Sequence, residues 1–309
     1  MGTPKLNALT EVRIGDAADL LRELPDRSVD LVFTSPPYED ARTYEDGMPG
    51  GRKFKLKGQA WVDWLAPILA DCCRVSKGLV LVNMSSVVRR FRYTGAVEML
   101  VADLIRLQGV VCGPAPYAWT KNGTPGSGGR HYHRRNWEPV YSFCLPDRLP
   151  LAFADPLKYG KAPKYGPGGK FTTRKRSGER VNVSVPKGEI DPRSRVHGKR
   201  KPDGNLRYRL YVPPKVANAG NVLSVCVGGG NLGHVLSHGS EAPMPQELAE
   251  RFIAWYCPPG GLCLDPFAGS GTTLAAAASM GRRGLGFEIR PKAAANAMAR
   301  LATTTAGMC

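Results

Sequence analysis

Two short segments of the chain combine residue types that could bind and activate a nucleoside. The first runs from Asp265 to Thr272 (DPFAGSGT), where an apolar stretch ends in a carboxylate and glycines lead into a predicted helix. Glycines at such a turn let a ligand approach the backbone N–H groups at the start of the helix. Glu288 ends the next apolar stretch, about where a carboxylate would accept hydrogen bonds from ribose hydroxyls. The pattern predicts a nucleoside-binding turn.

The same turn excludes two other nucleotide-binding motifs. No lysine follows the glycines, as a phosphate-binding Walker A loop requires. Leu274 occupies the place of the third glycine of the dinucleotide motif, which argues against a nucleotide-dependent dehydrogenase. Gly-x-Gly by itself is also compatible with an ordinary tight turn. The preceding Asp-Pro-Phe and the strand-to-helix context favour ligand binding.

The second segment, Thr34-Ser-Pro-Pro-Tyr38, directly follows the apolar stretch 31–33. Two prolines at the carboxyl end of a strand fix a rigid turn. This turn carries the Ser35 hydroxyl on one side and the Tyr38 ring on the other, an arrangement that suits a flat heterocycle. The alternative is an ordinary proline-rich turn with Tyr38 in the core.

The charge of the chain points to a polyanionic partner. Among 309 residues, 43 Lys and Arg stand against 26 Asp and Glu, a net charge of +17. Residues 158–209 carry +12 of this charge and hold 13 Gly and Pro, which predicts loops and short strands. This segment and the Gly-rich stretch 121–135 suit phosphate contacts. A solvated basic linker is the alternative interpretation of the charged segment.

The remaining sequence must position these segments. Before about residue 146 and after about 222, short apolar strands alternate with amphipathic helices, as in an α/β sheet. We expect strands at 11–14, 29–34, 79–84, 110–119, 139–145, 262–265 and 284–288, and helices at 16–24, 61–75, 246–256 and 272–280. We therefore predict two halves of one catalytic domain, residues 1–145 and 222–309, separated by a basic insert at 146–221.

Together these features resemble the amino-methyltransferases of DNA, which methylate the exocyclic nitrogen of cytosine or adenine with S-adenosylmethionine. Their catalytic motif, Ser/Asn/Asp-Pro-Pro-aromatic, matches residues 35–38, and their cofactor motif, D-P-F-x-G-x-G-T, matches residues 265–272. The catalytic motif comes first and the cofactor motif last, as in the family's β arrangement. The resemblance implies a circularly permuted, Rossmann-like S-adenosylmethionine-dependent methyltransferase sheet with a basic target-recognition insert.

The resemblance also implies roles for individual residues. The catalytic residues are expected to be Ser35, Pro36, Pro37 and Tyr38. The residues expected to bind the cofactor are Asp16, Asp265, Phe267, Gly269, Ser270, Gly271, Thr272 and Glu288. Asp16 would meet the adenine amino group and Glu288 the ribose hydroxyls. The cations expected to contact DNA are Arg130, Arg134, Arg135, Arg174, Lys175, Arg176, Lys199, Arg200 and Lys201.

The chemistry follows from the electronic structure of the base. The lone pair of its exocyclic amine is delocalised into the ring, so the amine is a poor nucleophile. The Ser35 hydroxyl oxygen and the Pro36 carbonyl would accept hydrogen bonds from the amino protons and aim the nitrogen at the methyl group. Tyr38 would stack on the flipped base. No cysteine follows a proline, so the nucleophile motif of a cytosine C5-methyltransferase is missing.

Serine at the first motif position is more typical of N4-cytosine enzymes, so we predict an N4-cytosine DNA methyltransferase. One alternative is methylation of N6 of adenine. A second alternative is a protein that is not an enzyme, namely a catalytically inert DNA-binding protein on the same fold. Related methyltransferases that act on RNA or on protein glutamine usually carry Asn-Pro-Pro-Tyr, and the Ser-Pro-Pro-Tyr of this chain therefore argues against these substrates.

The expected partner is double-stranded DNA. A homodimer and a restriction endonuclease acting on the same site are left open. We expect no metal, since Cys-x-x-Cys pairs are missing. No apolar run reaches the roughly 18 residues of a membrane span, and no secretory signal is evident at the N-terminus. We therefore expect a cytoplasmic protein of a prokaryote or phage.

Overall fold

The chain forms two compact units in the computed structural model. One comprises Met1–Asp155 and Asn221–Cys309, and the other Pro156–Gly220. The structure describes residues 10–39, 55–89, 92–113, 115–121, 136–148, 170–174, 177–184, 195–200, 206–208, 220–226 and 244–306. The roles predicted for the two halves and the insert stay predictions.

The larger unit is built on a nine-stranded sheet, in the order β1-β15-β14-β2-β3-β8-β7-β13, with β6 also paired to β8. Its strands are β1 (Thr10–Ile14), β15 (Arg283–Glu288), β14 (Leu262–Asp265), β2 (Leu31–Thr34), β3 (Val80–Asn83), β8 (Trp137–Cys144), β7 (Tyr117–Thr120), β13 (Val222–Ser224) and β6 (Val111–Cys112). The first five strands of this order run parallel, and β8 runs antiparallel to β3, β6 and β7. The fold is therefore the predicted α/β sheet of mostly parallel strands.

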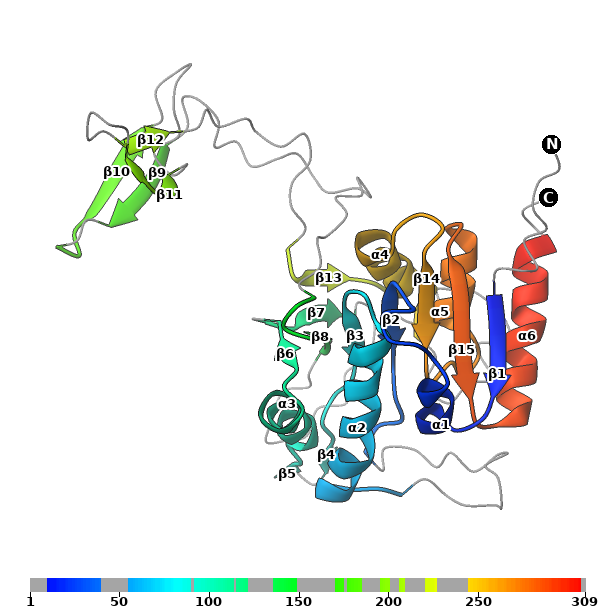
Figure 1. Cartoon of the computed structure of the whole chain (residues 1–309). Helices are drawn as coiled ribbons and strands as arrows, with labels where there is room; N and C mark the ends of the chain where they lie inside the picture. The colour runs from blue at the N-terminus through cyan, green and yellow to red at the C-terminus, as the bar shows by residue number, and fades with distance from the viewer. Residues whose placement is uncertain are drawn as a thin grey trace, which may run out of the picture. The chain divides into compact units, whose positions relative to one another are not determined.

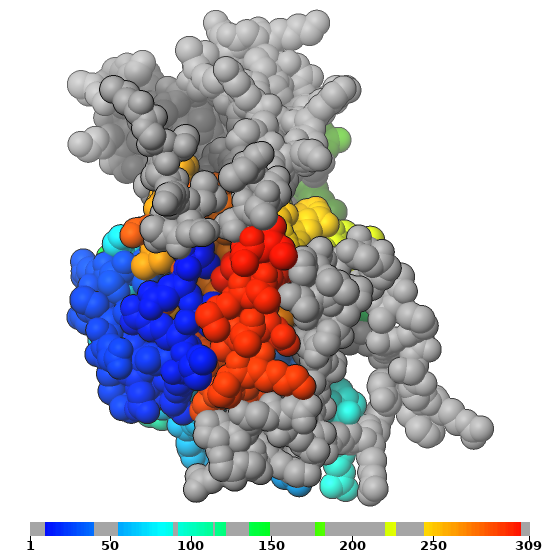
Figure 2. Space-filling model, turned by 90° about the vertical axis from the view of Figure 1, so that its right-hand side faces the viewer, coloured from blue at the N-terminus to red at the C-terminus, as the bar shows by residue number. Residues whose placement is uncertain are grey.

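Helices cover both faces of this sheet. The helices are α1 (Ala17–Arg22), α2 (Gln59–Val75), α3 (Ala96–Leu107), α4 (Gln246–Tyr256), α5 (Thr272–Ser279) and α6 (Pro291–Ala306). Helices α1, α2 and α3 pack side by side on one face, and α4, α5 and α6 pack on the other (Figure 1). Figure 2 shows α6, in red, lying beside the first elements of the chain, in blue. The N-terminal strand β1 pairs with β15 near the C-terminus, so elements from both ends of the sequence belong to one sheet.

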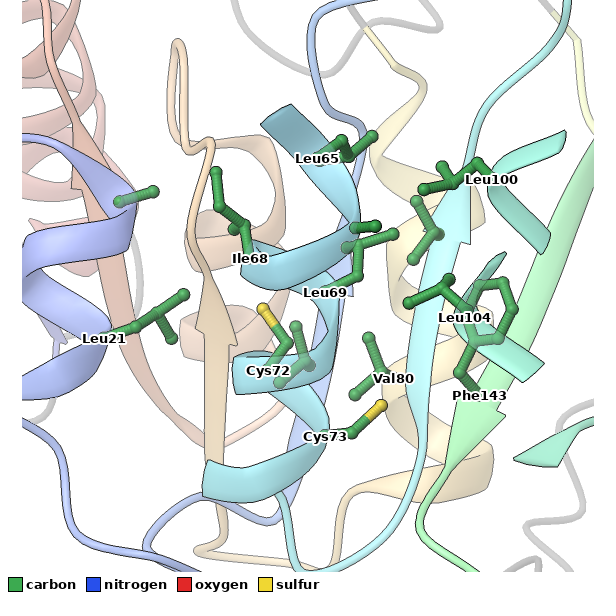
Figure 3. Close-up of a cluster of buried hydrophobic side chains, with 14 of the residues drawn as sticks. Leu21, Leu65, Ile68, Leu69, Cys72, Cys73, Val80, Leu100, Leu104 and Phe143 are labelled. Atoms are coloured by element: carbon green, nitrogen blue, oxygen red, sulfur yellow. The ribbon is translucent and has the colours of Figure 1, made fainter. Parts of the chain in front are cut away.

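Helix α2 forms the centre of the larger hydrophobic core. The apolar face predicted for it is confirmed, because Leu65, Leu69 and Cys72 are fully buried. Figure 3 shows these side chains among residues of α1, β3, α3 and β8, such as Leu21 and Phe143. Full burial of an aliphatic side chain stabilises the fold by about 1.5–3 kcal/mol. This packing fixes α2 beside β2, the strand that leads into the catalytic motif.

On the other face of the sheet, helix α5 packs closely against two glycines of β15. A Cβ atom at Gly286 would lie 2.6 Å from Leu274 Cδ1 and 2.9 Å from Ala268 Cβ, and one at Gly284 would lie 3.2 Å from Leu274 Cδ2. In dinucleotide-binding folds a glycine in the helix permits this close packing. In this protein the glycines that permit the close packing lie in strand β15. Leu274 of α5 can therefore stand where the dinucleotide motif has its third glycine.

We expect Gly286→Ala to lower the free energy of unfolding by about 1–3 kcal/mol, because the added methyl group overpacks a buried contact. Urea unfolding of the purified protein measures the change. Gly220→Ala is the matched control, since Gly220 is exposed and nothing lies within 4 Å of an added Cβ. Equal stabilities of the two variants would contradict this account of the β15–α5 contact.

Some predicted elements need correction. The single strand expected at 110–119 is wrong, because the chain forms β6 and β7 as separate strands that both pair with β8. Pro116 lies between them, and proline has no N–H to donate to a sheet. Helices α3 and α6 were not predicted, nor were the short strands β4 (Val88–Arg89), β5 (Arg92–Tyr93) and β13.

The smaller unit contains two pairs of antiparallel strands. Strand β9 (Lys170–Arg174) pairs with β10 (Arg180–Ser184), and β11 (Arg195–Arg200) pairs with β12 (Leu206–Tyr208). The short strands expected in the basic segment are thus present. Across the described ranges of both units, no helix has the length and apolar character needed to cross a membrane.

Candidate active site

The two predicted motifs meet at the centre of the sheet. Strands β14 and β2 are parallel neighbours, but the chain leads from β14 to β15 on one side and from β2 to β3 on the other. Open α/β sheets bind ligands at such a switch point, outside the carboxyl ends of the strands. Asp265 ends β14, and Ser35 directly follows β2. The sheet therefore brings the cofactor motif and the catalytic motif to the same edge.

A buried hydrogen bond joins these two motifs. The Thr34 hydroxyl donates to Asp265 Oδ1 over 2.6 Å, and the Phe267 N–H donates to the same oxygen over 3.1 Å. Burial raises the pKa of Asp265 to about 6, with a smaller contribution from the charge of Glu288, although the hydrogen bonds from Thr34 and Phe267 oppose the rise. A cation that bound beside this carboxylate would lower its pKa again. Sequence reasoning assigned no site role to Thr34.

The glycine turn adopts a backbone conformation that favours glycine. Gly269 and Gly271 have φ angles of 53° and 75°. A Cβ atom at Gly271 would lie 3.0 Å from Ala297 Cβ in α6, so a side chain there would also be tightly crowded. Because L-residues other than glycine rarely adopt such φ values, these positions explain why the motif needs glycine.

Glu288 holds the same turn in place. Its Oε2 accepts the Gly269 N–H over 2.9 Å, and its Oε1 accepts the backbone N–H and the Nε–H of Arg290, each over 3.0 Å. The residue is 7% exposed. Each carboxylate oxygen has two lone pairs, so these three bonds leave one acceptor site, on Oε2, for a ribose hydroxyl. The structure thus gives Glu288 a structural contact, and its predicted contact with ribose stays a prediction.

Asp16 lies at the end of the neighbouring strand. Ile14 of β1 pairs with Glu288 of β15, and the Gly15 N–H donates to the Glu288 carbonyl over 3.1 Å. Asp16 then caps α1 by accepting the Ala18 N–H over 2.8 Å. Carboxylates therefore lie at the ends of three adjacent parallel strands, β1, β15 and β14, at one edge of the sheet.

The remaining cofactor-motif residues pack against helices. The Phe267 ring lies 5.7 Å from the Trp64 ring of α2, measured between centroids. Ser270 and Thr272 are buried, and the Thr272 hydroxyl accepts a hydrogen bond from Arg300 of α6 over 2.8 Å. That contact directs the hydroxyl of Thr272 toward the protein interior, and sequence reasoning did not assign Arg300 to the site.

The catalytic turn is held by α2 and by the β7–β8 region. The indole N–H of Trp61, a fully buried residue, donates to the Pro37 carbonyl over 2.9 Å. Tyr38 is half-buried, and its hydroxyl donates to Glu138 Oε2 over 3.3 Å. Glu138 also forms an ion pair with Lys121. The sequence signal for Trp61 was its place on the apolar face of α2, because a buried indole N–H usually finds an acceptor.

Ser35 and Pro36 lie in this turn beside Asp265. Ser35 is half-buried and Pro36 is buried. Thr34, which immediately precedes them, is the donor to Asp265. The structure therefore brings Ser35 and Pro36, the predicted hydrogen-bond acceptors for the target amine, close to the Asp265 carboxylate, although these residues are far apart in the sequence.

The predicted DNA contacts are described only in part. Arg174, Lys199 and Arg200 belong to β9 and β11 of the smaller unit. The residues outside the described ranges are Arg130, Arg134, Arg135, Lys175, Arg176 and Lys201. DNA contact by all nine residues stays a prediction.

Comparison with known proteins adds independent information. DNA adenine methyltransferase YhdJ of Escherichia coli K12 is 25% identical over 281 residues, which cover 89% of this chain and 76% of that protein. Type II methyltransferase M.BamHI of Bacillus amyloliquefaciens is 24% identical over 283 residues, which cover 89% of this chain and 53% of that protein.

Solved structures share the fold. PvuII DNA methyltransferase, which is named as cytosine-N4-specific, aligns with a TM-score of 0.62 and 18% identity over 94% of this chain and 86% of that one. A putative DNA modification methylase of Thermus thermophilus, complexed with S-adenosyl-L-methionine, aligns with a TM-score of 0.56 and 22% identity over 97% of this chain and 96% of that one.

The sequence profile of the N6/N4 family described as DNA methylase matches residues 29–299. That range contains the catalytic turn after β2, the smaller basic unit and the cofactor motif after β14. Since the match covers most of the chain, the protein belongs to the DNA methylase family and is a DNA methyltransferase of the N6/N4 type.

Proposed function

We propose that the protein transfers a methyl group from S-adenosylmethionine to N4 of a flipped cytosine in double-stranded DNA. The observation that carries this proposal is the position of Ser35 and Pro36 at the sheet switch point, next to Asp265. A pair of hydrogen-bond acceptors there stands beside the segment that would hold the methyl donor.

The residues around the glycine turn fit the chemistry of this cofactor. S-adenosylmethionine, when bound, supplies an electrophilic methyl group on a sulfonium. We assign the methionine and ribose end to Asp265, Phe267, Gly269, Ser270 and Gly271, the ribose hydroxyls to Glu288 and the adenine amino group to Asp16. Three carboxylates at adjacent strand ends suit a ligand with an ammonium, hydroxyl groups and an amine.

The catalytic turn would localise the lone pair of the target amine. The Ser35 hydroxyl oxygen and the Pro36 carbonyl would accept hydrogen bonds from its two N–H groups, which makes the nitrogen more tetrahedral and aims it at the methyl carbon. Bound S-adenosylmethionine would supply the methyl carbon to this nitrogen, with the electron pair of the C–S bond staying on the sulfur, and the amine would give up one proton. Trp61 keeps the turn rigid through the Pro37 carbonyl.

The flipped base also needs a stacking surface and a hold on the DNA backbone. We assign the stacking surface to Tyr38, whose hydroxyl is fixed by Glu138. We assign backbone contacts to the basic residues of the insert and of the stretch 121–135, because cations there would neutralise phosphates.

N6 of adenine is the second candidate target. The relative YhdJ is named as an adenine methyltransferase, which supports this candidate. Serine in the catalytic motif supports cytosine, through the resemblance to N4-cytosine enzymes. The same acceptor turn serves both reactions, since each target is an exocyclic amine on an aromatic ring.

Mass spectrometry of nucleosides tests the proposal. Purified protein is incubated with S-adenosylmethionine and unmethylated duplex DNA of varied sequence, and the DNA is digested and compared with authentic standards. N4-methyldeoxycytidine is the expected product, and N6-methyldeoxyadenosine would move the target to adenine. Neither product, despite cofactor binding and DNA binding, would overturn the catalytic proposal in favour of an inert DNA-binding protein.

A further inference from the structure

A fully buried arginine lies behind the glycine turn. Arg300 of α6 is 0% exposed. Its guanidinium donates from Nη1 to Thr272 Oγ1 over 2.8 Å and to the Ser270 carbonyl over 3.5 Å, and from Nη2 to Gln246 Oε1 over 2.9 Å. Burying a guanidinium is costly, and an apolar residue would often stabilise a core as well. Helix packing alone therefore does not explain an arginine here.

These hydrogen bonds connect two segments that are separate in the sequence. Ser270 and Thr272 flank the second glycine of the cofactor motif, and Gln246 is the first residue of α4. Arg300 is thus the point at which α6 ties the glycine turn to the start of α4.

A second contact from the same helix supports this interpretation. Ala297 lies one turn before Arg300, and its Cβ would be 3.0 Å from a Cβ atom added at Gly271. Leu301 packs in a small cluster with Ala268 and Leu274. Helix α6 therefore contacts the turn and the start of α5 through Ala297, Arg300 and Leu301, on the face of the sheet opposite to α2.

We propose that Arg300 is a positioning residue for the cofactor, which holds the glycine turn and the start of α4 in the arrangement that receives the methionine end of S-adenosylmethionine. The inference rests on the proposed function of this site. Arg300 acts through these two segments and does not contact the cofactor itself.

The chemistry of the guanidinium suits this task. Burial lowers the pKa of Arg300 to about 10, so the group stays protonated at neutral pH and all its N–H groups remain donors. Its planar fork reaches acceptors in two segments at once. A lysine would keep the charge, but its single ammonium would not reproduce that geometry.

Two substitutions and one affinity measurement test the proposal. We expect Arg300→Met to weaken the binding of S-adenosylhomocysteine, measured by titration calorimetry, by about 10- to 100-fold, the size of a lost hydrogen bond to a charged group. Arg300→Lys should recover part of that loss. In both variants kcat for methyl transfer at saturating S-adenosylmethionine should stay near the wild-type value, since the catalytic turn is untouched.

Arg148 provides a matched control. It is 9% exposed and donates from Nη1 to the carbonyls of Cys73, Arg74 and Ser76 at the end of α2. Arg148→Met should lower stability as any broken buried network does, but leave the affinity for S-adenosylhomocysteine unchanged. An equal loss of affinity in Arg148→Met and Arg300→Met would show a general effect of stability and overturn the proposal.

If Arg300→Met does not fold, a second variant still tests the proposal. Gln246→Leu removes one acceptor of Arg300 and should weaken S-adenosylhomocysteine binding by a smaller factor, and it should add little to Arg300→Lys because the two residues act as a unit. Wild-type affinity in Gln246→Leu and Arg300→Lys would overturn the proposal. Failure of the wild-type protein to bind S-adenosylhomocysteine would instead refute the proposed function.

Discussion

Ser35→Ala will lower kcat for methyl transfer by about 10²- to 10³-fold, the usual cost of losing one hydrogen-bonding group that acts on the reacting centre. The serine oxygen is one of two acceptors proposed for the amino protons, and without it the lone pair of the amine stays delocalised. Affinity for S-adenosylhomocysteine should be unchanged, because the link between the two motifs is made by Thr34 and not by Ser35. Transfer of a labelled methyl group to duplex DNA measures kcat, and calorimetry measures affinity.

Ser279→Ala is the control for this experiment. Ser279 ends α5, at the opposite end of that helix from the glycine turn, and its hydroxyl donates to the Ala276 carbonyl over 2.9 Å. Its replacement should leave kcat at the wild-type value. The assigned role of Ser35 would be wrong if Ser35→Ala transferred methyl groups at the wild-type rate, or if it lost cofactor affinity in proportion to activity.

Asp265→Asn should have the largest effect on the cofactor. We expect about 10- to 150-fold weaker binding of S-adenosylmethionine, since the variant loses a charged acceptor facing a cationic ligand. Asparagine can still accept the hydrogen bonds from Thr34 and Phe267 through its carbonyl oxygen, so the local structure should survive. Asp19→Asn, on the exposed side of α1, is the control and should bind like the wild-type protein.

The affinity of the wild-type protein should also depend on pH. The pKa of Asp265 is raised to about 6 in the free protein, and a bound cation favours the ionised form. Below pH 6 the Asp265 carboxyl must lose its proton before the cationic cofactor binds. The affinity for S-adenosylmethionine should therefore fall about tenfold for each further unit by which the pH is lowered. Asp265→Asn has no such group and should show a flat profile over this range. A pH-independent wild-type affinity between pH 5 and 7, within the range where the protein stays folded, would contradict the assignment.

The same shift affects stability with a defined sign. The folded state holds the Asp265 proton more tightly than the unfolded chain, where an aspartate has a pKa of about 3.9. Between about pH 4 and pH 6 the folded state therefore binds more protons, and the contribution of this group to stability falls as the pH rises. The cost is present in full above about pH 6, and Asp265→Asn should remove it.

The sequence was sufficient for the chemistry-bearing motifs and for the class of fold. Apolar stretches of two kinds, with strand and helix periods, identified β2, β14, α2 and α5 close to their observed bounds. Such elements follow from local properties, namely the spacing of apolar residues and the glycines and prolines that end them. Helix α6 was not predicted from the sequence. Its position depends on packing against α5 and β1.

What the sequence by itself determined is the set of reactive groups: a hydroxyl, a rigid proline turn, an aromatic ring and carboxylates at strand ends. The tertiary structure decided which of these groups meet and what holds them. The contacts of Thr34 with Asp265, Trp61 with Pro37 and Arg300 with Thr272 each join residues that are distant in the chain. The physical reason is that a hydrogen bond depends on distance and direction between two atoms, and only the order of strands and the packing of helices fix these for residues far apart in sequence.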